Sequence, residues 1–221
     1  MFSVIFEVHP HADRKDEYLA LGKQLKPILE GIDGFIDNER FESLMRPGWV
    51  LSHSSWRDEK SLVRWRAQGE HHAVQRKGRD EVFADYHLRI GEVIHDSVPH
   101  EHASEGQHLD ETETGIAKVA SFTEITPQDG IDLGERPDEL LAQTGVTGLP
   151  GLVEHDLFAS IYNPGKLALL TSWRDADAAE SFAPSPIANL KALRHRTVRI
   201  IRDYGRFDRR EAPQYFPPVS R

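Results

Sequence analysis

The apolar residues of 2–8 (FSVIFEV) are all β-branched or aromatic, and this pattern predicts a β-strand that Pro10 ends. Apolar residues spaced three to four positions apart then predict a helix that Asp13 caps and that runs to Glu30. The expected elements of this part are a strand over 2–8, a helix over 13–30, strands over 35–43 and 49–56, a helix from 58 to 79–83, and a strand over 86–95. The order βαββαβ is that of a ferredoxin-like unit.

A stretch of this pattern occurs twice in the chain. Residues 43–58 (SLMRPGWVLSHSSWRD) return as residues 160–175 (SIYNPGKLALLTSWRD). At a constant offset of 117, the identical positions begin at Phe41 and Phe158 and end at Asp58 and Asp175. Each copy reads as two strands joined by a Pro-Gly turn and followed by a helix that starts at the Asp. The chain is therefore interpreted as two versions of one domain.

The second copy repeats the element order more loosely. The expected elements are a strand over 116–125, a short helix from Pro137 ended by Gly145, strands over 151–161 and 166–173, a helix from Asp175 interrupted by Pro184 and Pro186 and resuming to 194, and a strand within 195–207. The predicted domains are residues 1–97 and 116–207, with a polar linker over 98–115 and a proline-rich tail over 208–221. His100, His102 and His108 of the linker are read as part of a flexible acidic segment and not as a metal site.

Two tandem ferredoxin-like domains predict how the chain folds as a whole. A four-stranded sheet with both helices on one face leaves its other face bare, and that face must be buried. Packing the two sheets against each other solves this within one chain. The predicted fold class is α+β, with two βαββαβ domains packed sheet to sheet as an intrachain dimeric α+β barrel. The shared S-W-R-D residues then have a structural role, as a Trp plug and an Asp helix cap.

Composition excludes several classes of partner and chemistry. The formal net charge of −9 argues against nucleic acid and anionic membranes as partners, because both attract basic surfaces. The absence of cysteine excludes disulfides, thiolate metal sites and cysteine nucleophiles. No apolar run approaches the ~18 residues of a membrane span, and the N-terminus has no pattern of a secretion signal. A cytoplasmic protein is expected.

The helix expected after Trp56 carries an unusual stripe. A helix that covers a sheet normally presents Leu, Ile and Val, whereas the stripe here is Leu62, Trp65, Gly69, His72, Arg76, Arg79 and Phe83. A glycine that makes room beside aromatic and imidazole groups is typical of a small cavity with polar groups aimed inward. The second copy has Phe182, Pro186 and Asn189 in place of Trp65, Gly69 and His72. One working pocket is therefore predicted in the first domain and a degenerate one in the second.

Candidate roles follow from the chemistry of these side chains. His72 is the candidate general base, Trp65 stacks on the substrate, and Arg79 or Tyr86 stabilises a developing oxyanion. His71, by contrast, is expected at the surface. Glu7 is a further catalytic candidate, because a carboxylate on a covered strand face has a raised pKa and can act as a base. Gly69 and His53, in the strand before Trp56, complete the candidates from the residues themselves, although alternation leaves open whether Glu7 and His53 reach the cavity.

The first domain resembles the antibiotic biosynthesis monooxygenase family of dimeric α+β barrels. The resemblance lies in GFIDNERFES before the Pro-Gly turn and in LSHSSWRDEKSLVRWRAQGEHHAVQRKGRDEVFADYHLRIGEV after it. It implies an oxygenase: some members oxidise polycyclic phenols to quinones without metal or flavin, and others degrade haem with an Asn, a Trp and a haem-ligating His. The Trp corresponds to Trp65, the Asn position holds Glu7, and the His position holds Gln75, with His72 one helical turn earlier.

Three hypotheses follow for the function. The first is an enzyme, a monooxygenase that oxidises a small aromatic or polyketide-like substrate with O2 in the first-domain pocket and needs no cofactor. The second is a haem-binding protein with His72 as the iron ligand. The third is a barrel that binds a small ligand without chemistry. In each, the two domains form an intrachain pseudo-dimer, which leaves room for a further homodimer.

Overall fold

The computed structural model describes residues 1–99, 113–184 and 187–207. Most of the predicted linker and the whole predicted tail lie outside these ranges, as do His100, His102 and His108. In the first half the elements are β1 (Phe2–Pro10), α1 (Lys15–Glu30), β2 (Phe35–Ser43), β3 (Val50–Trp56), α2 (Glu59–Arg66), α3 (Gly69–Lys77), η1 (Gly78–Val82) and β4 (Phe83–Asp96). In the second half they are β5 (Val119–Pro127), α4 (Pro137–Thr144), β6 (Leu152–Ser160), β7 (Leu167–Trp173), α5 (Ala176–Glu180) and β8 (Leu190–Gly205).

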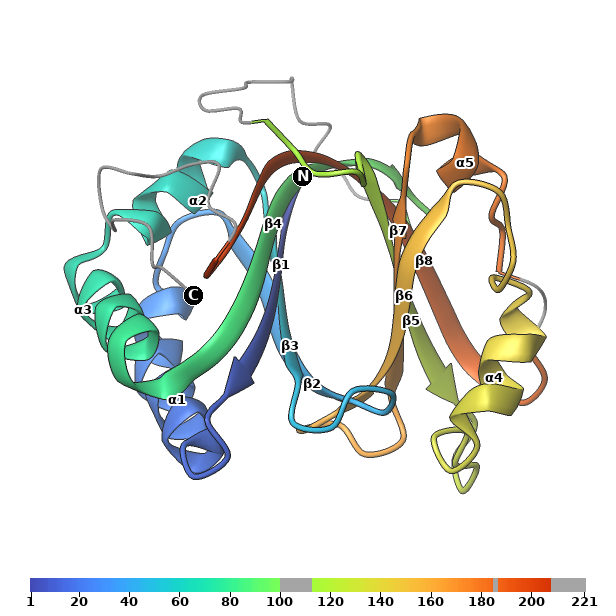
Figure 1. Cartoon of the computed structure of the whole chain (residues 1–221), viewed down its shortest axis with the longest axis horizontal. Coiled ribbons are helices and arrows are strands. Elements are labelled where there is room, and N and C mark those ends of the chain that lie inside the picture. The colour runs from blue at the N-terminus through green and yellow to red at the C-terminus, as the bar shows by residue number, and fades with distance from the viewer. Residues whose placement is uncertain (100–112, 185–186, 208–221) are drawn as a thin grey trace.

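The eight strands close into one antiparallel barrel in the order β1-β3-β2-β6-β7-β5-β8-β4. Each half contributes four neighbouring strands, and the halves join through the pairs β2–β6 and β4–β8. Figure 1 shows the two curved sheets facing each other, with α1, α2 and α3 outside one sheet and α4 and α5 outside the other. The prediction of an intrachain α+β barrel is confirmed. Closure leaves no free sheet edge, because the outer strands of one half pair with those of the other.

The residues shared by the two copies have the structural roles expected of them. Trp56 and Trp173 are fully buried. The Asp58 carboxylate accepts a hydrogen bond from the Ser61 amide at 2.8 Å, and Asp175 accepts one from the Ala178 amide at 2.9 Å. Each Asp thereby caps the short helix that follows it.

We expect Asp58→Ala to destabilise the protein by about 1 kcal/mol, which lowers the melting temperature by roughly 2–4 °C. Partial burial works against ionisation of Asp58, but its hydrogen bonds with Ser61 and Arg57 bring its pKa down to about 2. The stabilisation is therefore present above pH 4 and is lost as the pH falls towards 2. Asp58→Asn retains a capping oxygen and is the control for thermal melting. An equal loss in both variants would contradict the capping role.

The long helix expected from Asp58 to 79–83 is broken, and this prediction is wrong. Gln68 has an extended backbone (φ −69°, ψ 126°), and its side-chain oxygen accepts from the Glu70 amide at 2.6 Å. A side chain that caps the second segment ends the first. The chain then passes from α3 into a π-helical turn before β4. The break rotates every residue after Gln68 relative to an uninterrupted helix.

Two other helix predictions differ from the structure. Asp13 does not cap α1, which begins at Lys15 without a side-chain cap. In the second half α5 ends at Glu180 and does not resume, because residues 190–194 already belong to β8. The short helix α4, however, begins at Pro137 and ends at Gly145 (φ 71°), as predicted.

Candidate active site

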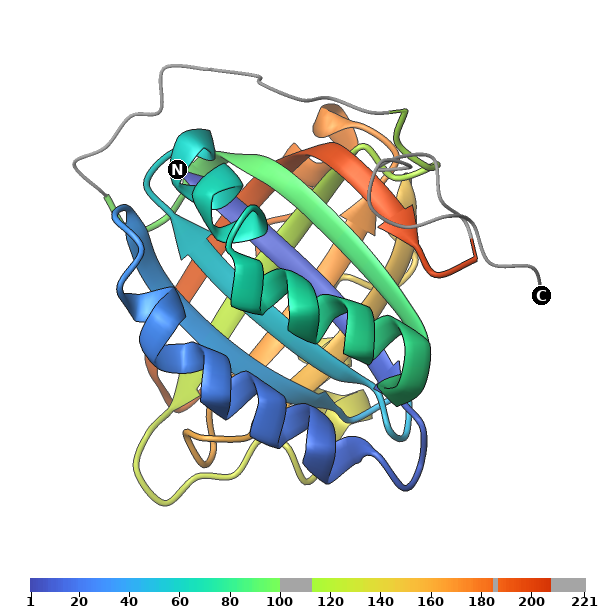
Figure 2. The same ribbon diagram turned by 90° about the vertical axis from the view of Figure 1, so that its left-hand side faces the viewer.

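A cavity of about 220 Å³ lies in the first half, between the outer face of the sheet and the helices that cover it. Figure 2 shows α1, α2 and α3 laid across the strands on this side. Strand alternation directs Val4 and Phe6 of β1 into the cavity, and Ser52 and Ser54 of β3 line it beside them. Apolar side chains of α1 cover the opposite wall. They are Leu21, Leu25 and Leu29.

Aromatic rings form the wall of the cavity nearest the start of β4. The Phe83 ring lies edge-on to Phe6 and to Tyr18, with both centroid distances 5.8 Å. Tyr86 lies 5.9 Å from Phe6 and is buried. Its hydroxyl accepts a hydrogen bond from Arg79 Nη1 at 2.6 Å. Arg79 and Tyr86 thus form a cationic, hydrogen-bonded pair in the cavity wall. Stabilisation of an oxyanion requires such fixed hydrogen-bond donors.

His71 lines the cavity, so the expectation that it lies at the surface is wrong. Its ring stacks on Trp65 at a centroid distance of 3.9 Å and an angle of 15°. Its Nδ1 lies 3.0 Å from the Trp65 carbonyl oxygen, which only accepts, so Nδ1 carries the proton. Burial lowers the His71 pKa to about 4, which leaves the ring neutral at pH 7. The break at Gln68 explains why His71 reaches the cavity. In the sequence, the Gln68-Gly69 pair is the signal of this break.

The structure brings together most of the residues that the sequence selected. Trp65, His72, Gln75, Arg79 and Tyr86 all line the cavity. His72 lies in the first turn of α3, where its amide donates to the Gln68 carbonyl at 2.9 Å. Their placement agrees with the prediction, and their roles stay predictions.

Gly69 does not make room for a ligand, which corrects one prediction. It is exposed, and a Cβ added there would meet no atom within 4 Å. Its place is the first residue of α3, directly after the break. Gly22 on α1 does leave space, but for the side chain of Arg40: a Cβ there would lie 2.5 Å from its guanidinium.

Glu7 and His53 lie on the other side of the sheet, inside the barrel. Both alternate with cavity residues, so their side chains point the opposite way. His53 is hydrogen-bonded to Ser3 Oγ at 2.8 Å and stacks on Phe122 of the second half at 4.1 Å. Burial holds its pKa well below the ordinary value. Neither residue can therefore contact a substrate in the cavity. The roles of Glu7 as a base and of His53 as a substrate-binding residue do not agree with these positions.

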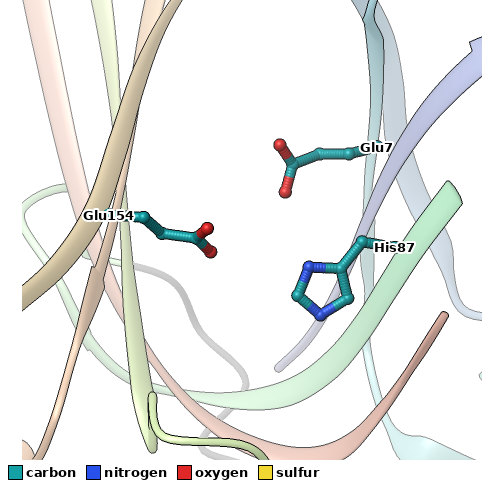
Figure 3. Close-up of side chains that lie close together, drawn as sticks. All are labelled: Glu7, His87 and Glu154. Atoms are coloured by element: carbon teal, nitrogen blue, oxygen red, sulfur yellow. The ribbon is translucent and has the colours of Figure 1, made fainter. Parts of the chain in front are cut away.

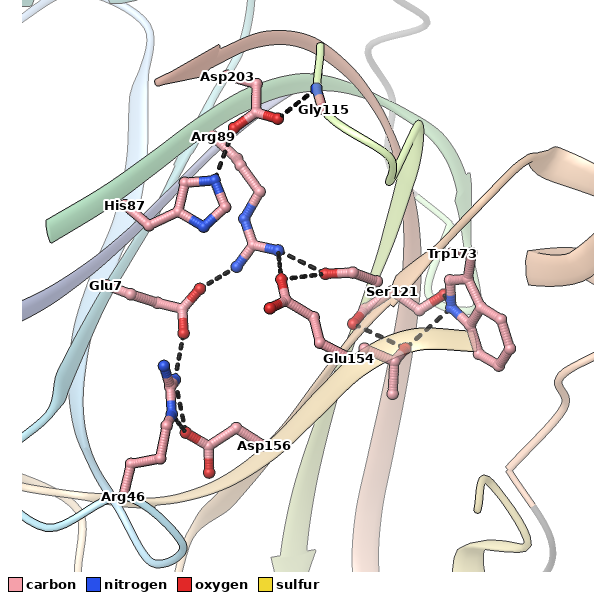
Figure 4. A network of polar contacts seen from close by, with 12 residues as sticks. Glu7, Arg46, His87, Arg89, Gly115, Ser121, Glu154, Asp156, Trp173 and Asp203 are labelled. Carbon is pink, nitrogen blue, oxygen red and sulfur yellow. Dashed lines mark hydrogen bonds and ion pairs between the residues drawn. The ribbon is translucent and has the colours of Figure 1, made fainter. Parts of the chain in front are cut away.

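Glu7 belongs instead to an ion-pair network that joins the halves (Figure 4). Arg89 donates to Glu7 and to Ser172 of the second half, and Arg46 bridges Glu7 to Asp156. A similar network forms in the other copy around Glu124, the counterpart of Glu7, although its bridging Lys166 stands at the position of Trp49 and not at that of Arg46. There Arg196 donates to Glu124 and Ser55, and Lys166 bridges Glu124 to Glu39. Two similar networks thus join the halves across the interior of the barrel.

Glu7, His87 and Glu154 form a cluster whose ligand atoms lie within 4.8 Å of one another (Figure 3). Arg89 pairs with both carboxylates, at 2.8 Å from Glu154, and so already supplies the positive charge of the cluster. His87 Nε2 lies 2.6 Å from Asp203. The group is therefore part of the barrel network.

Sequence reasoning missed several polar residues of the cavity, and four of them come from α1, β2 and β8. Tyr18 comes from α1, Arg40 from β2, and Arg202 and Tyr204 from the end of β8. Since Arg202 pairs with Ile90 and Tyr204 with Leu88, the last strand of the second half extends the first sheet and completes its cavity. Arg202 is buried and forms an ion pair with Glu59 at 3.2 Å. Only the closure of the barrel brings these strands together, so no local pattern signals them.

The equivalent region of the second half is packed with apolar side chains. Phe182, the counterpart of Trp65, lies 5.4 Å from Trp173. It belongs to a buried cluster with Leu140, Leu141 and Ile187. Apolar side chains thus fill the region that corresponds to the first-half cavity, and the loss of function in the second half stays a prediction.

The fold and the cavity define a class: a single-chain α+β barrel made of two fused half-barrels, with a helix-covered cavity in the first. Comparison with known proteins gives the family. The model of the antibiotic biosynthesis monooxygenase family matches residues 1–77. A jasmonate monooxygenase from Pyricularia oryzae is 41% identical over 227 residues, which cover 100% of each chain. The chain belongs to the antibiotic biosynthesis monooxygenase family and is a monooxygenase.

Solved structures agree on the fold. An aldoxime dehydratase in complex with butyraldoxime has a TM-score of 0.58 at 13% identity, over 92% of this chain and 81% of that one. A second aldoxime dehydratase structure has a TM-score of 0.56 at 12% identity, over 90% and 80% of the two chains. At these identities the likeness concerns the fold alone. None of the helices in the described ranges has the length and apolar character needed to traverse a bilayer.

Proposed function

We propose that the protein uses O2 to oxidise a small, mainly apolar molecule that carries one acidic oxygen group, bound in the first-half cavity. The observation that carries this proposal is the mixed lining of the cavity. Aromatic and aliphatic side chains surround a few polar groups, among them His72, Arg40 and the Arg79–Tyr86 pair. The first substrate candidate is a jasmonate-like acid, because the relative that matches the whole chain is a jasmonate monooxygenase.

The proposed roles use the positions described above. His72 removes a proton from the substrate, since the neutral His71 ring is a weak base with its pKa near 4. The stacked rings of Trp65 and His71 offer a flat surface for the substrate. Arg79 and Tyr86 stabilise the oxygen on which negative charge develops. Jasmonate is a ring ketone, and proton loss beside its carbonyl gives an enolate with its charge on such an oxygen.

A substrate anion of this kind removes the need for a cofactor, and we propose that none is required. An enolate or phenolate is rich enough in electrons to reduce O2. Oxidation of an activated CH2 group to a carbonyl takes up one oxygen atom and releases the other as water. All four electrons that O2 accepts then come from the substrate carbon. The protein supplies the base, the oxyanion-stabilising pair and exclusion of water.

A small phenol or polyketide-like aromatic remains the second candidate substrate. The rings of Trp65 and His71, together with Phe6, Phe83 and Tyr86, favour a flat aromatic ligand. In this case the phenolic oxygen occupies the place of the enolate oxygen.

Haem does not fit the cavity as it stands, although His72 offers an imidazole there. The cavity has about 220 Å³, whereas pockets that bind drug-sized ligands have roughly 300–1,000 Å³, and a haem is larger than most such ligands. We expect titration with haemin to produce no protein-bound Soret band. A Soret band that is lost in His72→Ala would contradict this and would favour the haem-binding hypothesis.

Oxygen consumption tests the proposed function directly. The wild-type protein is incubated with jasmonate and with a panel of small phenols, in air and under anaerobic conditions, without added cofactor. We expect O2 uptake with at least one of these compounds, an oxygenated product by mass spectrometry, and no product without O2. Turnover that appears only with an added reductant would contradict the cofactor-free proposal. No oxidation under any of these conditions would reject both substrate classes.

A further inference from the structure

Arg40 is a half-buried arginine of the cavity wall that differs from three fully buried arginines of the barrel. Arg89, Arg196 and Arg202 each form an ion pair with a glutamate. Arg40 lines the cavity and forms no ion pair with any carboxylate of the described residues. Glu42, the next residue of β2 on the same face, is paired with Lys15 at 2.5 Å. A charge that is partly shielded from water and has no counter-charge is unfavourable, so a cavity that contains one is suited to an anionic ligand.

The neighbours of Arg40 hold its guanidinium in place without neutralising it. Arg40 Nη1 lies 3.5 Å from the Asn38 side-chain oxygen. The amide nitrogen of Asn38 donates to the His53 carbonyl at 2.8 Å, which fixes the orientation of the amide. Gly22 leaves the space that the guanidinium occupies, because a Cβ there would lie 2.5 Å from Nη2. Arg40 Nε is buried and makes no hydrogen bond within the described ranges.

The hydroxyl of Tyr18 is the second polar group at this end of the cavity. It is buried and forms no hydrogen bond of good geometry in the described part of the chain. The Arg40 guanidinium carbon lies 5.8 Å from the centroid of its ring. Burial raises the Tyr18 pKa, and the nearby Arg40 opposes the shift only in part. The hydroxyl therefore keeps its proton at neutral pH and remains a hydrogen-bond donor.

We propose that Arg40 and Tyr18 bind the carboxylate of the substrate and so select a small monocarboxylic acid over its neutral analogues. This inference rests on the proposed function and specifies its substrate class. A guanidinium binds a carboxylate through two parallel hydrogen bonds, and a phenolic hydroxyl adds a third donor. The aliphatic side chains of α1 then contact the apolar body of the acid. Arg40 thus determines specificity, while Arg79 and Tyr86 act at the reacting oxygen.

Binding of jasmonate and its uncharged methyl ester tests the proposal. Calorimetry under anaerobic conditions compares the wild type with Arg40→Gln, Arg40→Lys and the exposed control Arg76→Gln. We expect Arg40→Gln to weaken jasmonate binding about 10- to 100-fold, as loss of a charged hydrogen-bonding partner does. Binding of the ester stays unchanged. Arg40→Lys keeps the charge but not the planar pair of donors, so it restores binding only in part. Arg76→Gln binds both compounds as the wild type does.

Thermal melting of the unliganded variants separates a ligand-binding role from a structural one. We expect Arg40→Gln to melt no lower than the wild type, because it removes a cation without a counter-charge. Lower stability of Arg40→Gln with an unchanged preference for the acid would overturn the proposal. A wild type that binds the ester or a phenol as tightly as the acid would overturn it too, and would leave the proposed function standing. A wild type that binds none of these compounds would overturn both.

Discussion

Replacement of His72 by alanine is expected to lower turnover by about 100- to 10,000-fold, the usual contribution of a general base. His72 lines the cavity beside the Trp65–His71 stack, whereas the apolar core of the first half is formed by other residues, including Phe2, Trp56 and Leu62. The variant should therefore keep its fold, with a melting temperature within roughly 2 °C of the wild type, which corresponds to less than about 1 kcal/mol. The measurement is initial O2 uptake together with thermal melting.

Two further histidine variants serve as controls for His72→Ala. His11→Ala changes an exposed residue of the loop after β1 and should turn over like the wild type. His71→Ala removes a stacking ring that is neutral at pH 7, so it should raise KM more than it lowers kcat. A His72→Ala variant with full turnover, or a larger loss of kcat in His71→Ala, would refute the assignment of the base.

The second large effect concerns the barrel and not the cavity. We expect Glu7→Gln to cost about 3–5 kcal/mol of stability, because it leaves the buried charge of Arg89 without its closest partner. The Glu7 and Arg89 side chains are 5% and 1% exposed, so solvent does little to compensate for the loss. For a chain of this length the melting temperature should fall by roughly 6–20 °C. Urea unfolding measures the free energy directly.

Glu154→Gln is the matched control for Glu7→Gln. Glu154 pairs with the same arginine at 2.8 Å, but its side chain is 51% exposed. Exposed ion pairs contribute about 0–1 kcal/mol, so this variant should be close to the wild type. Equal losses in the two variants would show that burial does not determine the strength of the network. Folded Glu7→Gln should also retain turnover, because the sheet separates residue 7 from the cavity.

The same network predicts a dependence of stability on pH. Burial opposes ionisation of Glu7, but Arg89 and Arg46 outweigh it and hold the Glu7 pKa below its ordinary value. A carboxylate with a lowered folded-state pKa stabilises the protein above its unfolded-state pKa of about 4.3 and loses that contribution as the pH falls further. The stability difference between wild type and Glu7→Gln should therefore shrink below pH 4. A difference that is constant from pH 7 to pH 3 would contradict the ionised pair.

The internal duplication of the sequence was the feature that predicted most of the fold. Identical residues at one offset gave two copies of one unit, and the bare face of its sheet required the copies to pack together. The structure agrees down to the two Trp plugs and the two Asp caps. The stripe on the helix after Trp56 likewise led to a cavity lined by Trp65, His72 and Arg79. These features depend on local spacing, which a sequence displays directly.

The predictions for His71 and Gly69 were wrong because one sequence pattern is compatible with two backbone conformations. Nothing in the periodicity of residues 58–83 distinguishes an uninterrupted helix from one that Gln68 breaks, and the break brings His71 into the cavity and leaves Gly69 outside it. Arg40 was missed because a charged residue on a half-buried strand is usually a surface residue. Its position in the cavity wall depends on Gly22 and Tyr18, which belong to another element.

The sequence by itself determined the two copies, the order of their strands and helices, and which neighbours on a strand point to opposite faces. It separated Phe6 from Glu7 and Ser52 from His53, because alternation is a property of the strand alone. Only the tertiary structure decided which face the helices cover and which face lies inside the barrel. That choice depends on long-range pairing, the same pairing that brings β8 beside β4 and places Arg202 and Tyr204 in the cavity of the other half.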